Sequence, residues 1–254
     1  MIHFVASDLD GTLLQKDGTL PPETFCVIRQ LKDNGILFCA ASGRQYDNLR
    51  RLFAPVADDI CYICENGSHV VAGEFQNYSV IPPDMAEGII HDILESGMQL
   101  LLSVPNTSLL LETANKHFTD DIFYRLRNTS AIIPDHSIYL GKYIKISGFH
   151  PDGVENIAPA LIRKWSPHLH ADIAGHKWLD FTCSNKADGI NILSEHLNIP
   201  TSNMAAFGDQ FNDLAMLQVV GRPYLMKNAP KELQAYSFAC CDSVIKELKS
   251  IMKQ

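Results

Sequence analysis

Two carboxylates one residue apart stand near the start of the chain, in the run Asp8-Leu9-Asp10-Gly11-Thr12. The apolar stretch before them, His3 to Ser7, predicts a buried parallel strand that ends at Asp8. Side chains at positions i and i+2 of a strand point to the same side, so both carboxylates are expected to face one cavity. Gly11 would let the chain turn sharply beneath a ligand there.

These carboxylates can act on a phosphate ester only beside a cation. At about 4 Å, a phosphate dianion would repel one carboxylate by roughly 8 kcal/mol at an effective dielectric near 20. A hard divalent cation such as Mg²⁺ binds carboxylate, carbonyl and phosphate oxygens together, and so shields the attacking oxygen from the anion. The residue types therefore predict a Mg²⁺ site that handles phosphate.

A second set of carboxylates follows a second apolar stretch. Met204 to Phe207 predicts a strand that leads into Gly208-Asp209, and a helix is expected from Asn212. Asn212 and Asp213 lie three and four residues after Asp209, so all three are expected to project from one side of an opening helical turn. A third metal carboxylate is thereby available.

Two other side chains suit phosphate oxygens. Ser42 is a hydroxyl beside Gly43 at the end of a predicted strand, Ile36 to Ala41. Lys186 is a cation at the start of a helix, separated from Asp209 by one helix and one strand. In most chains such a lysine would lie on the surface, but this spacing favours a place in the site.

The elements that must position these residues alternate between strand and helix at both ends of the chain. The middle differs: we expect helices at 84–96, 119–126 and 154–165, strands at 98–104, 109–112 and 143–149, and a final strand pair. The simplest fold is a Rossmann-like three-layer α/β core with a parallel sheet, made of residues 1–82 and 180–254. Residues 83–179 form an inserted α+β module, with Pro82-Pro83 and Asp180-Phe181 as its hinges.

Four motifs in this order resemble those of the haloacid dehalogenase-like superfamily, and within it the Cof-type phosphatases with an inserted cap of type IIB. They are Asp8-Leu9-Asp10-Gly11-Thr12, Ala41-Ser42-Gly43-Arg44, Asn185-Lys186 and Gly208-Asp209-Gln210-Phe211-Asn212-Asp213. Glu65-Asn66-Gly67 and Asn228-Ala229 are also similar to the family, so the resemblance spans the whole chain.

The resemblance implies a role for each site residue. Asp8 would be the nucleophile and a metal ligand, Asp10 the general acid/base with its carbonyl on the metal, and Asp209 the remaining ligand. The phosphate would be held by Ser42, Gly43, Lys186 and Asn212. Asp213 would contact these groups or the metal ligands without binding the metal itself. His176 and Trp178 of the cap are candidate substrate contacts.

The resemblance also implies a function, a Mg²⁺-dependent phosphatase of small phosphorylated metabolites, with sugar phosphates first. A dehalogenase of the superfamily would need neither the metal nor an acid/base at the position of Asp10. A phosphomutase would keep every motif, and a regulator that binds a phosphorylated metabolite without turnover would keep the fold. The residues alone do not identify the phosphate ester.

Composition and charge indicate which partners and which cell compartment are expected. A formal charge of −8 with an isoelectric point near 5.6 disfavours a nucleic-acid partner. Seven cysteines, an odd number, argue against a disulfide framework and for the cytoplasm. No apolar run is long enough to predict a membrane span, and a monomer or weak homodimer is expected. Cys61 and Cys64, on one predicted strand, are expected to be buried fillers.

Overall fold

The structure, a computed structural model, describes residues 1–253 as two compact units. The first consists of Met1–Arg44, Leu49–Asn77 and the chain from Asn185 onward, and the second of Gln45–Asn48 and Tyr78–Ser184. None of the helices within residues 1–253 is long and apolar enough to cross a membrane.

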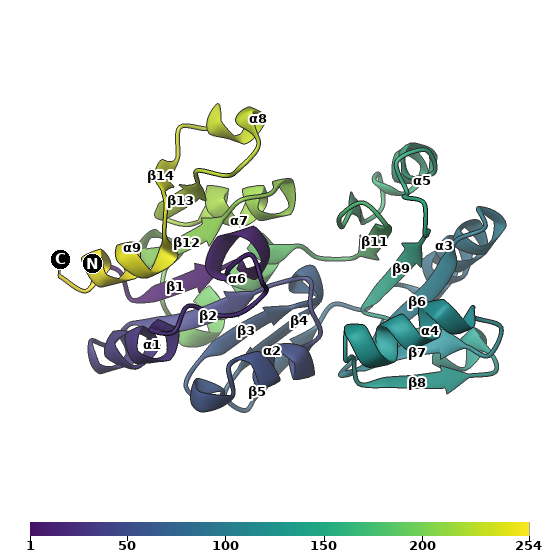
Figure 1. Cartoon of the computed structure of the whole chain (residues 1–254), viewed down its shortest axis with the longest axis horizontal. Helices are drawn as coiled ribbons and strands as arrows, with labels where there is room; N and C mark the ends of the chain where they lie inside the picture. The colour runs from purple at the N-terminus through teal and green to yellow at the C-terminus, as the bar shows by residue number, and fades with distance from the viewer. Residues whose placement is uncertain (254) are drawn as a thin grey trace. The chain divides into compact units, whose positions relative to one another are not determined.

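In the described residues of the first unit, an eight-stranded sheet has the order β14-β13-β12-β1-β2-β3-β4-β5 (Figure 1). The strands are β1 (Phe4–Ser7), β2 (Leu37–Ala41), β3 (Cys61–Cys64), β4 (His69–Ala72), β5 (Phe75–Tyr78), β12 (Met204–Gly208), β13 (Arg222–Met226) and β14 (Ala239–Cys241). The strands from β14 to β3 in this order pair in parallel, and β3 and β4 pair antiparallel. The predicted parallel-sheet core is therefore confirmed.

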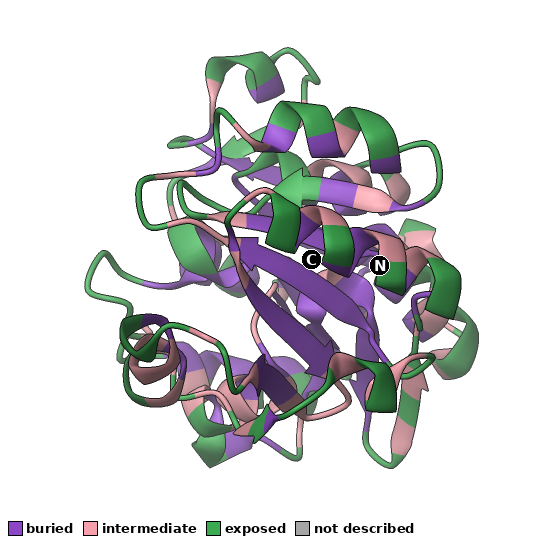
Figure 2. Cartoon of the chain, turned by 90° about the vertical axis from the view of Figure 1, so that its right-hand side faces the viewer, coloured by how far each residue is buried: buried purple, intermediate pink, exposed green. Residues whose placement is uncertain are grey.

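Helices cover both faces of this sheet, which is why its central strands are apolar throughout. Phe4 and Ala6 of β1 belong to one buried cluster with residues of α6 (Lys186–Leu197) and α7 (Leu214–Val219). Val5 points to the opposite face and is equally buried. On that face α1 (Thr24–Asp33) contacts β2 and α9 (Val244–Ile251). Figure 2 shows the central strands coloured as buried along their length.

The register of the sheet brings two motifs to one edge. β1 pairs with β12 from Phe4 and Met204 to Ser7 and Phe207, so the two strands end side by side. Ligands of open parallel sheets bind beyond the carboxyl ends of the strands. The residues that follow β1 and β12 therefore share the position where a site is expected.

Other elements of the first unit differ in detail from the sequence-based expectation. Helix α6 begins at Lys186, because Asn185 and Asp188 form a capping box with its first turn. The last two strands of the chain, β13 and the edge strand β14, were not predicted. The shorter helices are α2 (Tyr46–Leu52), whose first residues belong to the second unit, and α8 (Lys231–Gln234). Cys61 and Cys64 are both buried in β3, as expected.

The described part of the second unit carries a six-stranded sheet in the order β10-β11-β9-β6-β7-β8. Its strands are β6 (Gln99–Val104), β7 (Thr107–Leu111), β8 (Ser130–Ile133), β9 (Lys145–Phe149), β10 (His170–Ile173) and β11 (Trp178–Thr182). All neighbours pair antiparallel except β7 and β8, which are parallel. This is the mixed α+β pattern that the sequence predicted for the middle of the chain.

Two helices pack on this sheet in one buried cluster, α3 (Pro83–Glu95) and α5 (Ala158–Trp165), and α4 (Lys116–Asp120) packs in a smaller one. The helix expected at 154–165 begins only at Ala158, because Pro159 fits the first turn but not the interior of a helix. The helix expected at 119–126 is divided between α4 and a π-helical turn, Asp121–Arg125. The strand β8 was not predicted.

One predicted hinge is wrong. Asp180 and Phe181 lie inside β11, where Asp180 pairs with Ser147 of β9 and with Asp172 of β10. A strand paired on both sides cannot serve as a flexible hinge. The chain leaves the second unit after Ser184 instead.

Candidate active site

Asp8 is buried where β1 ends. Its backbone N–H donates to the carbonyl oxygen of Phe207 at 2.9 Å, which ties it to β12. The chain then turns through an irregular segment, Leu9–Leu13, in which Gly11 has a φ of +87°. A Cβ on Gly11 would lie 2.3 Å from Oδ2 of Asp209, so glycine is needed where this turn passes the second carboxylate.

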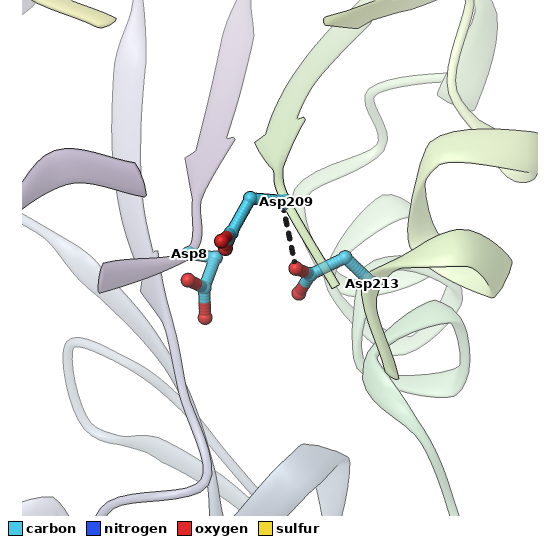
Figure 3. Close-up of side chains that lie close together, drawn as sticks. All are labelled: Asp8, Asp209 and Asp213. Atoms are coloured by element: carbon cyan, nitrogen blue, oxygen red, sulfur yellow. Dashed lines mark hydrogen bonds between the residues drawn. The ribbon is translucent and has the colours of Figure 1, made fainter. Parts of the chain in front are cut away.

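Three buried carboxylates meet at this edge of the sheet: Asp8, Asp209 and Asp213. One oxygen of each lies within 4.8 Å of the other two. Figure 3 shows Asp8 and Asp209 arriving from the ends of two neighbouring strands, and Asp213 from the turn that follows Asp209. The short helix η7 (Phe211–Asp213) returns Asp213 to the strand end, where its Oδ2 accepts hydrogen bonds from the N–H groups of Asp209 and Gln210, both at 3.0 Å.

A buried ammonium compensates part of this charge. Nζ of Lys186, the first residue of α6, donates to Oδ1 of Asp8 and to Oδ1 of Asp213, both at 2.6 Å. The side chain of Lys186 is 1% exposed. Lysine is almost never buried unless it is paired, so this geometry confirms that Lys186 is not a surface residue.

The environment shifts the pKa values of these groups. Burial raises the pKa of Asp8, and the attraction of Lys186 only partly offsets it. Burial opposes the charged form of Lys186, but Asp213 and Asp8 outweigh it and hold the pKa of the lysine above its ordinary value. Burial also raises the pKa of Asp209. Concentrated negative charge of this kind would be stabilised by a bound cation.

Neutral donors hold the carboxylate of Asp209 in place. Oγ1 of Thr12 donates to its Oδ1 at 3.0 Å. Nε2 of Gln210 and Nδ2 of Asn228 donate to its Oδ2 at 3.2 and 3.1 Å. Asn228 also donates to the carbonyl of Gly11 at 2.9 Å, and so links the turn after β1 to Asp209. Sequence reasoning assigned no role to Thr12, Gln210 or Asn228, although all three lie in segments that resemble family motifs.

The carboxylate of Asp10 does not join the cluster that the alternation of a strand predicted for it. The strand ends at Ser7, and Asp10 and Gly11 have non-helical angles within the turn that follows, so the period of two does not continue to Asp10. Its carboxylate instead accepts from Arg44, with Nη2 at 2.5 Å and Nε at 3.0 Å. The predicted trio of Asp8, Asp10 and Asp209 carboxylates is replaced by Asp8, Asp209 and Asp213.

The other predicted phosphate contacts lie at two different degrees of burial. Ser42 is buried just after β2, and its N–H donates to the carbonyl of Ile63 at 2.8 Å. Gly43 follows, and a Cβ there would lie 2.9 Å from Oδ1 of Asn66. Asn212 is exposed, in η7. Their contact with a phosphate stays a prediction.

A backbone segment in the left-handed region supports Ser42 and Arg44. Glu65, Asn66 and Gly67 have φ values of +49°, +57° and +105°. The N–H of Glu65 donates to the carbonyl of Arg44, and that of Asn66 to the carbonyl of Ser42, both at 3.1 Å. Two of these residues, Glu65 and Asn66, are not glycine, so the left-handed region costs them conformational energy, and such strain concentrates at functional sites.

We expect Gly67→Ala to lower the free energy of unfolding by at least about 3 kcal/mol, since left-handed strain and a steric clash add. The new Cβ would lie 2.0 Å from the carbonyl oxygen of Asn185, which is backbone and cannot move aside cheaply. The matched control is Gly73→Ala, with a φ of +60° and nothing within 4 Å of the new Cβ, where strain alone should cost about 1–2 kcal/mol. Equal losses in denaturant unfolding would contradict the close approach.

Two predicted substrate contacts of the second unit have local partners. Nδ1 of His176 lies 2.5 Å from Oε1 of Glu155. The ring of Trp178 packs with Phe149 and Phe118, at centroid distances of 4.9 and 5.9 Å. The exposed pair of His176 with Glu155 and the aromatic packing of Trp178 do not test a role in substrate binding, so substrate contact at both positions stays a prediction.

The residues present suit a divalent cation. Carboxylate oxygens are the ligands that hard cations prefer, and three of them converge from buried positions. One ammonium among three carboxylates leaves an excess of negative charge if all are ionised. Both oxygens of Asp213 already accept hydrogen bonds, from Lys186 and from two backbone amides, which favours Asp8 and Asp209 as ligands.

Comparison with known proteins matches residues 5–247 to the family model described as haloacid dehalogenase-like hydrolase. Over 245 residues the chain is 29% identical to an HMP-PP phosphatase of Enterobacter sp. (strain 638), covering 92% of this chain and 88% of that protein. Over 240 residues it is 27% identical to the 5-amino-6-(5-phospho-D-ribitylamino)uracil phosphatase YitU of Bacillus subtilis (strain 168), covering 89% and 87%.

A solved structure with the same fold is that of a sugar phosphatase of HAD subclass IIB. It superposes with a TM-score of 0.83 over 98% of both chains, at 20% sequence identity. This likeness concerns the fold. The elements of the second unit therefore occur, in the same chain order, in a protein of solved structure.

Proposed function

Because the chain belongs to the haloacid dehalogenase-like hydrolases and has the fold of subclass IIB, we propose that it is a Mg²⁺-dependent phosphatase that forms a phosphoryl intermediate on Asp8. The observation that carries this proposal is the arrangement around Asp8. Its carboxylate is buried at a strand end, 2.6 Å from the ammonium of Lys186 and within 4.8 Å of two further carboxylates. This arrangement suits a nucleophile that must be both oriented and shielded.

In the first half of the reaction, a carboxylate oxygen of Asp8 attacks phosphorus and the bond to the leaving oxygen breaks. Lys186 holds Asp8 in orientation and offers positive charge to the phosphate oxygens. Ser42, Gly43 and Asn212 would donate hydrogen bonds to the same oxygens. Asp10 gives a proton to the leaving alkoxide, which therefore departs as an alcohol.

In the second half, water attacks phosphorus and Asp8 leaves as a carboxylate. Asp10, now ionised, takes a proton from that water, as microscopic reversibility requires. Asp213 keeps Lys186 and the backbone of Asp209 in place through both halves.

We propose that the carboxylates of Asp8 and Asp209 and the backbone carbonyl of Asp10 hold Mg²⁺. Bound there, the ion would neutralise charge between carboxylate and phosphate oxygens and so lower their repulsion. Thr12, Gln210 and Asn228 would fix the orientation of Asp209 toward it.

For the substrate, we propose a small phosphorylated metabolite. The two similar phosphatases are named for HMP-PP and for a phosphoribityl aminouracil, and the structural neighbour is a sugar phosphatase. A panel of sugar phosphates, nucleotides and cofactor phosphates, ranked by kcat/KM for phosphate release, tests this. A phosphomutase would convert a sugar phosphate while releasing little free phosphate, and a binding regulator would turn over no member of the panel.

We propose that the inserted module, residues 83–179 on the sequence pattern, is a cap that selects the alcohol. Its elements carry no motif that the phosphoryl transfer needs. A cap that excludes water favours the first half of the reaction, but the second half needs one water, so the cap must open or admit it.

Exchanging this module for that of a relative should change which ester is preferred, while kcat/KM for a small aryl phosphate stays within about tenfold. The exchange is best made at residues 78 and 184, because β11 then stays whole. The measurement is the rank order of kcat/KM over the panel. A rank order that follows the first unit in the chimera would contradict the division of roles.

A further inference from the structure

The side chain of Arg44 makes a two-point ion pair with Asp10. Its Nη2 and Nε lie 2.5 and 3.0 Å from the two oxygens of the carboxylate. A planar guanidinium that binds both oxygens fixes the rotation of a carboxylate as well as its position. A lysine or a single hydrogen bond would not fix the rotation of the carboxylate.

The pair is too exposed to matter much for stability. The side chains of Arg44 and Asp10 are 36% and 61% exposed, and ion pairs of this kind stabilise folded proteins little. A well-defined geometry with little effect on folding calls for another explanation. The carboxylate it orients stands two residues after Asp8, in the turn that passes the acidic cluster.

The backbone of Arg44 is itself held in place. Its N–H donates to Oγ of Ser42 at 3.3 Å, and its carbonyl accepts from the N–H of Glu65 at 3.1 Å. Glu65 belongs to the strained left-handed segment that follows β3. Arg44 is therefore fixed at its backbone and extended to Asp10 at its guanidinium.

We propose that Arg44 is a positioning residue for Asp10, and that it aims this carboxyl group at the leaving oxygen. The proposal rests on the function proposed above. A carboxylate has about four lone-pair sites, so two hydrogen bonds from arginine leave one site on each oxygen for the reacting proton. The guanidinium can thus stay in place while Asp10 exchanges a proton with the alcohol or with water.

This role predicts a dependence on the leaving group. An alkoxide needs a proton as it leaves, whereas p-nitrophenolate is stable without one. If the carboxyl group of Asp10 is misoriented, hydrolysis of an alkyl phosphate should therefore slow, whereas hydrolysis of an aryl phosphate should change little. Because kcat/KM reports steps up to the first irreversible one, it isolates the half-reaction in which the alcohol leaves.

The experiment compares kcat/KM for p-nitrophenyl phosphate and for the best alkyl phosphate of the panel. Asp10→Asn should slow the alkyl ester by about 10²–10⁴-fold and the aryl ester far less. Arg44→Ala should slow the alkyl ester by about 10- to 100-fold, the aryl ester by less than about threefold. Arg44→Lys should recover only part of the loss, because an ammonium cannot bind both oxygens in one plane.

A double-mutant cycle and a matched control complete the design. In the Asp10→Asn background, Arg44→Ala should cause no further loss for the alkyl ester, because it acts only through Asp10. The control is Arg50→Ala, which removes another exposed ion pair, that of Arg50 with Asp58 at 2.7 Å. It should leave kcat/KM unchanged for both esters. Melting temperatures are measured for every variant, and Arg44→Ala should match Arg50→Ala.

Four outcomes would overturn the proposal. Equal losses for both esters, or a loss that persists in the Asp10→Asn background, would place Arg44 on the phosphate itself. If Arg44→Ala leaves kcat/KM unchanged for both esters, Arg44 has no role in the reaction. Equal losses for both esters in Asp10→Asn would remove Asp10 as the acid and this proposal with it. None of these results bears on phosphoryl transfer to Asp8, which the activity of Asp8→Asn tests separately.

Discussion

Asp8→Asn is expected to lower kcat by at least about 10³-fold while the protein still folds, because the amide cannot form the acyl phosphate. The two side chains have almost the same volume, so the buried end of β1 can keep its packing. Asn also retains an oxygen that can accept the hydrogen bond from Lys186, which lies 2.6 Å from Oδ1 of Asp8. The substitution removes the charge of the attacking group and keeps the surrounding packing and hydrogen bond.

The same variant should melt close to the wild type. Losing one of three clustered carboxylates relieves repulsion, whereas Lys186 loses one of two anionic partners, and these effects oppose each other. Steady-state hydrolysis and a thermal melt measured together separate catalysis from folding. Asp58→Asn, at an exposed carboxylate that pairs with Arg50 and contacts no residue of the acidic cluster in that pair, is the control and should keep full activity. Activity of Asp8→Asn within about tenfold of the wild type would remove Asp8 from the role.

Removing divalent cations should abolish hydrolysis, and Mg²⁺ should restore it. The acidic cluster has too few cations of its own, and an incoming phosphate adds two further negative charges. Ca²⁺ should restore activity poorly, because its longer bonds and higher coordination number would misplace the attacking oxygen. Undiminished turnover after exhaustive chelation would contradict the metal requirement.

Binding of Mg²⁺ should also raise the melting temperature, since a ligand that binds only the folded state stabilises it. This readout is independent of activity. Asp209→Asn should reduce the Mg²⁺-dependent rise, because it removes one proposed ligand. Asp58→Asn is again the control, and the rise should stay as in the wild type.

The sequence predicts the central part of the site well because its determinants are local. β1 and β12 are short apolar stretches that end in carboxylates, and parallel pairing alone brings Asp8 and Asp209 together. The place of Lys186 at the start of α6 was likewise readable from its position before a helix. These predictions use only strand ends, helix starts and residue types.

The remainder depends on contacts between segments far apart in the chain. Asp10 was placed with Asp8 by the alternation of a strand, but the strand ends first and Arg44, from the segment after β2, takes its carboxylate. Asp213 joins the cluster because two backbone amides and Lys186 fix both of its oxygens. The short strands β8 and β13 are defined by pairing with neighbours, which no local pattern reveals.

The central claim is that the phosphoryl group is transferred twice, first to Asp8 and then to water. The stereochemistry at phosphorus tests it directly, using an ester whose phosphorus is made chiral with sulfur and oxygen isotopes, hydrolysed in isotopically distinct water. Each in-line displacement inverts the configuration, so two displacements return the original one. The account predicts overall retention. Overall inversion would mean that water attacks the ester directly, and it would contradict a phosphoryl intermediate on Asp8.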